Sequence, residues 1–293
     1  MNTMENIHPA VIVFYFLSVM VTAMFVSNPV IVIAAFFGGV FFLMSRKPKR
    51  EMLSGFRLYL PLFLVITLTN PLFSHNGVTP LFFLNGNPIT VEAFVYGALF
   101  AGTLIAVMIW CRCFSEIVTT EKFLFLSERL FPKLALVLSM TLRFLPLFKR
   151  QMQKVDRASK AMGLYAEKNF FEKIRAKGRV FMAVIGWAFE NAMETANSMR
   201  ARGYGIGKRT HFSLFRMTGR DGVLFGTSLT LILLTLIGTF RGETSFSCYP
   251  AITRLSLTPL SILTYSAFIL LCFLPVICEA KEAIKWHYCL AKH

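Results

Sequence analysis

Charged side chains are missing from long stretches of this sequence. Residues 9–45 contain none, and no lysine or arginine occurs from position 58 to position 111. Over the 293 residues, 55% of the side chains are hydrophobic, although the net charge is +16. Uncharged runs of this length are typical of membrane-spanning helices and exclude a soluble globular domain. The first basic residue is Arg46, so the charged start of a secretory signal peptide is also missing.

Groups that perform chemistry are scarce. No carboxylate lies inside an apolar run, Glu92 being only at an edge, whereas ion-coupled carriers need such groups near the membrane midplane. The closest match to a phosphate-binding loop, 203–210, fails because Arg202 and Arg209 replace a required glycine and a required Ser or Thr. The histidines and cysteines have no metal-ligand spacing and suggest no disulfide framework. We therefore expect no catalytic residue, no metal and no directly bound cofactor.

The apolar runs predict an all-α membrane protein with about six spans. As one helix, run 9–45 would be roughly 55 Å long, almost twice a hydrocarbon core of about 30 Å. It must therefore fold back, and the Ser-Asn-Pro sequence at 27–29 is the natural turn. The expected spans are 10–26, 30–44, 57–73, 93–110, 222–240 and 257–278.

The distribution of lysine and arginine predicts the orientation. Residues 45–57 hold five, 111–221 hold 21 and 279–293 hold three, which is 29 of the 31 in the chain. Because cytoplasmic loops are rich in these residues, both termini are expected in the cytoplasm and the loops 74–92 and 241–256 outside. The chain then divides into an N-terminal membrane region (1–110, four spans), a cytoplasmic region (111–221) and a C-terminal membrane region (222–293, two spans and a short tail).

The basic segment 111–221 predicts two long helices. The first begins at a Pro-Lys step at 132–133, after a short segment over 121–131, and ends at Gly163. Its first half is almost entirely apolar. Its second half is amphipathic, with apolar side chains at steps of three or four residues.

The second long helix is expected after a polar stretch, from about Val180 to Arg202. Its apolar start is too short to span a membrane. Ala188, Ala192 and Ala196, at steps of four, would let another helix approach closely. Both long helices thus run from an apolar half at membrane level to a basic tip in the cytoplasm.

Counting the two apolar halves as further spans would give eight. Lys133, Arg143 and Lys149 surround the first of them, and each charge makes insertion into lipid costly. Six spans are therefore preferred, with the apolar halves lying across the inner leaflet.

The tip of the second long helix carries the more informative motif. Gly203, Gly205 and Gly207 stop the helix, and Arg202 in its last turn opposes the negative end of the helix dipole. Arg200 and Arg202 can be a routine helix end, or their basic face can contact anionic lipid. An exposed guanidinium on a rigid helix end is also a good fork for carboxylates or carbonyls on another protein.

At these residues the chain resembles the transmembrane (T) component of energy-coupling factor (ECF) transporters, the CbiQ/EcfT family of ABC-type vitamin and metal importers. The resemblance covers essentially the whole chain. It includes Thr-Asn-Pro-Leu-Phe at 69–73, Thr-Leu-Arg-Phe-Leu-Pro at 141–146 and above all Ala201-Arg202-Gly203-Tyr204, which matches the family's Ala-Arg-Gly coupling motif. The family's second such motif corresponds to Ala161-Met162-Gly163, where methionine replaces the arginine.

The resemblance implies a non-catalytic subunit in the cytoplasmic membrane of a bacterium or archaeon. Two cytoplasmic ABC ATPases, which bind the ATP, would dock on the tips. A small membrane-embedded substrate-binding (S) component would pack on the apolar helix halves and be reoriented to import a vitamin, a cofactor precursor or a transition-metal ion. The implied ATPase-coupling residues are Ala161, Met162, Gly163, Ala201, Arg202 and Gly203, with supporting basic contacts at Arg157, Lys160 and Arg200. The implied S-component contacts are Leu138, Leu142, Leu145, Ala188, Ala192 and Ala196.

Three other functions are weighed against this one. An orthodox ABC permease would carry substrate through its own pathway, but the spans offer few polar residues beyond Thr67, Thr69 and Asn70. A membrane-bound enzyme would need a nucleophile or ligand motif, and none is found. Nucleic-acid binding by the basic segment is disfavoured because that segment is tethered at a membrane.

Overall fold

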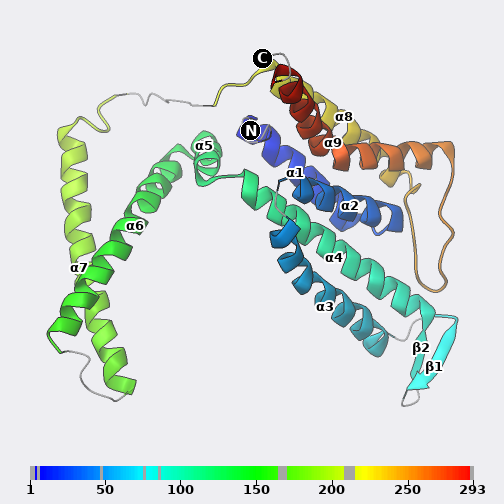
Figure 1. Ribbon diagram of the computed structural model, residues 1–293, viewed down its shortest axis with the longest axis horizontal. Coiled ribbons are helices and arrows are strands. Elements are labelled where there is room, and N and C mark those ends of the chain that lie inside the picture. Colours follow the sequence, from blue (N-terminus) through cyan, green and yellow to red (C-terminus); the bar gives the residue numbers. More distant parts are fainter. Residues whose placement is uncertain are drawn as a thin grey trace. The chain divides into compact units, whose positions relative to one another are not determined.

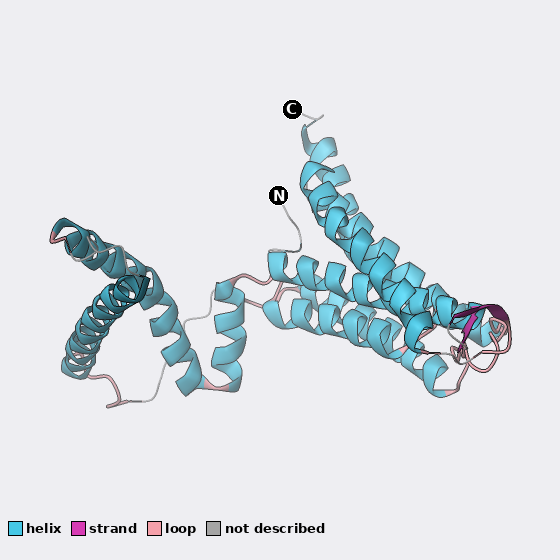
Figure 2. Ribbon diagram, turned by 90° about the horizontal axis from the view of Figure 1, so that it is seen from below, coloured by secondary structure: helices cyan, strands magenta, loops and turns pink. Residues whose placement is uncertain are grey.

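The computed structural model describes residue 4 and residues 7–46, 49–74, 77–84, 87–163, 170–207 and 215–290. The chain forms two compact units, one from residues 1–123 and 215–293 and the other from residues 124–214. Most of the described chain is helical, and the only strands in it are two short ones (Figure 2). The predicted all-α membrane fold is confirmed.

The larger unit contains the helices that the sequence assigns to the membrane. All six expected spans coincide with apolar helices, of which four are long and apolar enough to cross a bilayer and two are shorter. The number of crossings and the sides of the termini stay predictions. The helices of this unit are α1 (Pro9–Phe25), α2 (Pro29–Arg46), α3 (Lys49–Phe73), α4 (Val91–Ile117), α8 (Gly219–Phe240) and α9 (Pro259–Leu290).

The turn between α1 and α2 lies where the sequence places it. Asn28 is almost completely buried there, and its side-chain oxygen accepts a hydrogen bond from the Val30 amide at 3.0 Å. Its side-chain amide donates to the Thr244 carbonyl at 3.2 Å and to the Tyr265 hydroxyl at 3.0 Å. One side chain therefore satisfies orphan backbone groups and ties this turn to the α8–α9 connection and to α9.

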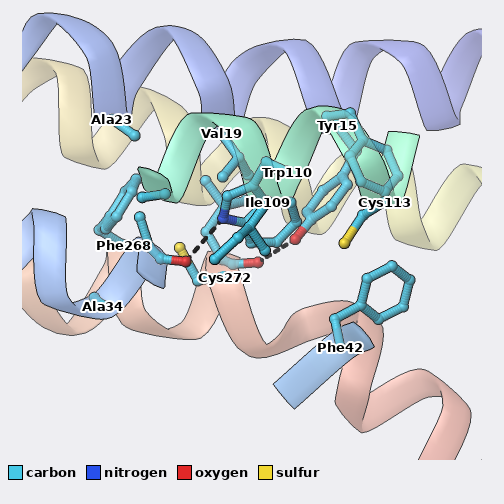
Figure 3. Packing of buried hydrophobic residues seen from close by; sticks show 14 of the residues in the cluster. Tyr15, Val19, Ala23, Ala34, Phe42, Ile109, Trp110, Cys113, Phe268 and Cys272 are labelled. Atoms are coloured by element: carbon cyan, nitrogen blue, oxygen red, sulfur yellow. Dashed lines mark hydrogen bonds between the residues drawn. The ribbon is translucent and has the colours of Figure 1, made fainter. Parts of the chain in front are cut away.

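The core of the larger unit is centred on Trp110 of α4, which is fully buried (Figure 3). Its indole nitrogen donates to the Ala35 carbonyl of α2 at 2.9 Å, and the Tyr15 hydroxyl of α1 donates to the Leu271 carbonyl of α9 at 2.8 Å. A Cβ atom on Gly38 would lie only 2.7 Å from the Cβ of Cys272, so α2 and α9 pack at a distance that only glycine permits. These contacts join four helices around one core.

The connection between α3 and α4 contains structure that the sequence did not predict. Within the expected external loop 74–92, strands β1 (Pro80–Leu84) and β2 (Asn87–Thr90) form an antiparallel hairpin. Glu92, in the first turn of α4, accepts hydrogen bonds from the Thr79 amide at 3.2 Å and the Thr79 hydroxyl at 2.7 Å. Glu92, at the edge of an expected span, thus holds this connection against the start of α4.

The smaller unit is built on α6 (Pro132–Ala161) and α7 (Phe170–Ala201), which pack on one another and cross (Figure 1). The short helix α5 (Thr120–Leu130) precedes them, as the sequence indicates. The rings of Phe148 in α6 and Trp187 in α7 form a T-shaped pair, with centroids 5.9 Å apart. Two long helices were predicted, and both are present.

The predicted start of the second long helix is wrong. It was placed at about Val180, whereas α7 begins at Phe170. The polar stretch before Val180 is predicted to be non-helical, but Ala176 and Val180 are both buried at a helical spacing of four. Burial of this seam outweighs the low helix propensity of one glycine, about 1 kcal/mol.

Candidate functional site

The C-terminal end of α6 is the first of the two predicted tips. Met162 is the C-cap residue, and its amide donates to the Ala158 carbonyl at 3.0 Å. Gly163 follows with φ of +75°, a left-handed conformation that favours glycine, and donates to the Lys160 carbonyl at 3.0 Å. Met162 is left 71% exposed although it is apolar.

The C-terminal end of α7 is the second tip, and it closes with a complete Schellman motif. The Tyr204 amide donates to the Met199 carbonyl and the Gly203 amide to the Arg200 carbonyl, both at 3.0 Å. Gly203 has φ of +78°, and Arg202 before it is exposed. These two hydrogen bonds satisfy carbonyl groups at the helix end, so the backbone that carries Arg202 is fixed.

The two tips have the same backbone register. Ala161 and Ala201 are each the last helical residue, and a left-handed glycine stands two positions later in both. Met162 and Arg202 therefore occupy equivalent positions between the helix and its glycine. The alignment of Ala-Met-Gly with Ala-Arg-Gly, drawn from sequence, has a geometric basis.

The charges at the two tips differ. On α6, Lys160 is paired with Asp156 of the preceding turn at 2.7 Å, while Arg157 is exposed. On α7, Arg200 and Arg202 are both exposed, and neither forms an ion pair within the part of the chain that the structure describes. The α7 tip thus offers two guanidinium groups, whereas the α6 tip offers a thioether beside a partly neutralised lysine.

The predicted alanine row on α7 continues a row of buried side chains on the same helix. Ala176, Val180 and Val184 are buried at steps of four, and the same steps lead to the three alanines. Ala188 is half-buried, whereas the two that follow it are exposed. One ridge of α7 is therefore buried in its first half, half-buried at Ala188, and exposed at Ala192 and Ala196.

The predicted leucines on α6 are likewise open. Leu138, Leu142 and Leu145 are all exposed, in the half of α6 that precedes the Phe148–Trp187 contact. Further along α7, Phe189 and Met193 are 68% and 64% exposed. Both helices leave apolar side chains uncovered outside their crossing, and large exposed apolar surfaces mark interaction sites with proteins or membranes.

One feature of the site was missed from sequence. The first turns of α7 carry Lys173, Arg175, Lys177 and Arg179, all exposed, although cations are unfavourable at a helix N-terminus. Phe170 and Phe171 beside them are 72% and 82% exposed. The sequence did contain a signal for this part of the helix. Ala176 and the two valines that follow it are spaced four residues apart, and this spacing places the basic stretch on the helix.

Comparisons with known proteins show the family of the chain. The model of the family CbiQ, described as "Cobalt transport protein", matches residues 2–212. The energy-coupling factor transporter transmembrane protein EcfT of Lacticaseibacillus paracasei is 36% identical over 107 residues, 36% of this chain and 40% of the relative. EcfT 1 of Listeria monocytogenes is 33% identical over 104 residues, 35% and 38% of the two chains.

A longer and weaker match is found with EcfT of Bacillus selenitireducens. It is 25% identical over 228 residues, which are 70% of this chain and 80% of the relative. The first two matches above span only about two fifths of the relatives' length. The family model, in contrast, extends over both tips and over the alanine row between them.

Proposed function

Because the chain belongs to the CbiQ family, as the transmembrane component of a bacterial energy-coupling factor transporter, we propose that it is the coupling subunit of that transporter. It has no catalytic role in this proposal. It passes the ATP-driven motion of two cytoplasmic ABC ATPases to a separate membrane-embedded S component. The cytoplasmic side holds both termini and the residues 45–57 and 111–221. The segments on this side carry 29 of the 31 basic residues.

The single observation that carries the proposal is the exposed Arg202 on a closed helix end. Its backbone is fixed by the Schellman motif, and its guanidinium has no carboxylate partner within the described chain. A planar fork on a rigid support is suited to bidentate hydrogen bonding with carboxylates or carbonyls. One ATPase binds this tip, and the second binds the equivalent position at Met162.

The apolar surfaces of α6 and α7 are the proposed seat of the S component. Small side chains at Ala188, Ala192 and Ala196 allow a partner helix to approach the α7 backbone, as in membrane helix pairs. The exposed leucines of α6 supply apolar area beside it. Movement of the two tips by the ATPases shifts α6 and α7 at their crossing and so reorients the bound S component.

The cargo is a vitamin, a cofactor precursor or a transition-metal ion. The family description names cobalt transport, which falls in this class. The S component selects the cargo in this scheme, and the chain holds neither cargo nor ATP.

The buried hydroxyls of the larger unit favour this role over an orthodox permease. Thr22, Ser228, Thr235 and Thr264 each donate to a backbone carbonyl of their own helix, at 2.7–3.0 Å. A substrate pathway needs polar groups that are turned toward a cavity instead. These hydroxyls are engaged within the helices that carry them.

Affinity purification in mild detergent, followed by mass spectrometry, tests the proposal. The tagged chain is expressed in its native host, and the charge-reversed Arg254→Glu variant serves as a control away from both tips. Two ABC ATPases and one small, very hydrophobic membrane protein are expected with both versions. Recovery of a second large permease and a soluble binding protein would instead support an orthodox permease. Recovery of no ATPase would contradict the proposed binding of ATPases at the two tips.

A further inference from the structure

An apolar groove runs along the larger unit between α2, α3 and α4. Both α2 and α3 pack closely on α4 but hardly touch one another, so α4 forms the floor and the other two form the walls. The groove has a volume of about 750 Å³, within the range of about 300–1,000 Å³ that is common for ligand sites. Phe36 and Phe63 line opposite walls, and Leu99 and Gly102 line the floor.

The length of the groove matches one leaflet of a bilayer. Its floor extends from Val95 to Ile105 of α4, ten helical steps or about 15 Å at 1.5 Å per residue. The hydrocarbon core is about 30 Å thick, so the groove covers about half of it. The wall residues Ile33 and Leu60 are 56% and 67% exposed, which shows that the groove is open on its outer side.

Among the residues that the structure describes, one cation, Arg57 of α3, lines the groove. Its neighbour Gly55 lies against the Arg112 guanidinium near the end of α4, so Arg57 is at the end of the groove away from Val95. Arg112 has a carboxylate partner, Glu116, at 4.0 Å, whereas Arg57 is exposed and forms no ion pair with any residue that the structure describes. The groove thus joins a leaflet-long apolar surface to one uncompensated positive charge.

We propose that this groove binds an anionic phospholipid, with one acyl chain along α4 and the phosphate at Arg57. An apolar chain that ends in an anionic headgroup matches both the lining and the position of the cation, and basic pockets between membrane helices bind such headgroups. The lipid belongs to the cytoplasmic leaflet, an assignment that rests on the orientation proposed above. The occupied groove would fix the spacing between α2 and α3, which have little direct contact.

The experiment counts phospholipids that stay on the purified protein. The full chain is reconstituted in nanodiscs of equal phosphatidylglycerol and phosphatidylcholine, released into mild detergent and analysed by native mass spectrometry. Wild type should retain one phospholipid, with phosphatidylglycerol preferred about fivefold, the effect of roughly one cation near an anionic surface. Because no other subunit is present, the result does not depend on the coupling role.

Two variants and a control separate the apolar and the charged contributions. Ala98→Phe fills the groove and should remove the retained lipid, whereas Leu104→Phe, exposed on the same helix but outside the groove, should not. Arg57→Gln should keep the lipid but lose the preference for phosphatidylglycerol. Equal retention by wild type and Ala98→Phe, or an unchanged preference in Arg57→Gln, would overturn the proposal.

A partner helix is the main competing occupant. The same count is therefore made on the transporter purified with its other subunits, alongside crosslinking from an Ala98→Cys variant. Retention of the lipid in the assembled transporter supports the proposal. Loss of the lipid on assembly together with a crosslink from position 98 to another subunit would assign the groove to that subunit instead.

Discussion

The two long helices of the smaller unit end alike in backbone and differently in side chain. Both place a left-handed glycine two positions after the last helical residue, with φ of +75° at Gly163 and +78° at Gly203. Between helix and glycine stands an exposed methionine in one tip and an exposed arginine in the other. The backbone geometry of the two helix ends is thus the same, while the side chain before the glycine differs.

Under the proposed function, this difference implies that the two tips contact the ATPases with unequal strength. Arg202 offers charge-assisted, directional hydrogen bonds, which are roughly twice as strong as neutral ones and weaken with salt. Met162 offers a flexible, polarisable surface that adapts to its partner and carries no charge. Substitutions at the two tips can separate these two contributions.

Arg202→Glu is expected to abolish ATPase association and uptake. The substitution reverses the charge at a fixed helix end. It places a carboxylate opposite the hydrogen-bond acceptors of the ATPase that bind the guanidinium in the proposed complex. The protein itself should still insert, because Arg202 is exposed and contributes nothing to the core. Co-purification of the ATPases and radiolabelled uptake in intact cells are the measurements. Wild-type uptake would show that Arg202 has no coupling role.

Truncation of each tip side chain to alanine tests the inequality directly. Arg202→Ala should weaken ATPase binding about 30-fold, or ~2 kcal/mol, because a charged partner is left unpaired. Met162→Ala should cost about tenfold, or ~1.4 kcal/mol, which corresponds to the loss of roughly two methylene-sized contacts. Titration of the ATPases at several salt concentrations should show a reduced salt dependence only in Arg202→Ala. An equal loss of ATPase affinity and an equal salt dependence in both variants would mean that the two tips bind the ATPases in the same way.

Gly203→Ala tests whether the closed backbone matters. An alanine at φ of +78° costs about 1–2 kcal/mol, so the tip should loosen and Tyr204 amide exchange should speed up. Gly178→Ala is the matched control. It lies inside α7 with no atom within 4 Å of an added Cβ, and alanine there should stabilise the helix by about 0.5–1 kcal/mol. Similar exchange of the Tyr204 amide in wild type and Gly203→Ala would contradict the role of the motif.

Met162→Arg should have the smallest effect. It restores the family pattern at a position whose backbone register already equals that of Arg202, so uptake should stay within about threefold of wild type. An increase in the salt dependence of ATPase binding is expected, because a second ionic contact is added. Loss of ATPase binding in this variant would show that the α6 tip meets an apolar groove.

Sequence reasoning identified the features that depend on local chemistry. The turn at Asn28, the apolar runs and the glycine-terminated tips are set by residues a few positions apart. The start of α7 was missed because the polar stretch before Val180 resembles a loop until the burial of Ala176 is known. The hairpin after α3 has no hydrophobic alternation strong enough to stand out from a loop.

The groove of the larger unit could not have been read from the sequence. It exists because α2 and α3 both pack on α4 without closing on one another, which depends on contacts such as Trp110 with Ala35 and Asn70 with Ala93. Arg57 appears in the sequence as one more basic residue at a span end. Its proposed role in phospholipid binding follows only from the apolar surface that it borders.

Site-specific photo-crosslinking at the two tips tests whether the ABC ATPases bind there. A photoreactive amino acid replaces Met162 or Tyr204, both exposed, and Ile252 in the loop after α8 serves as the control position. The account predicts that both tip positions crosslink to ABC ATPases in the assembled transporter and that Ile252 does not. Crosslinks from the tips to lipid alone, or to the S component but never to an ATPase, would contradict it.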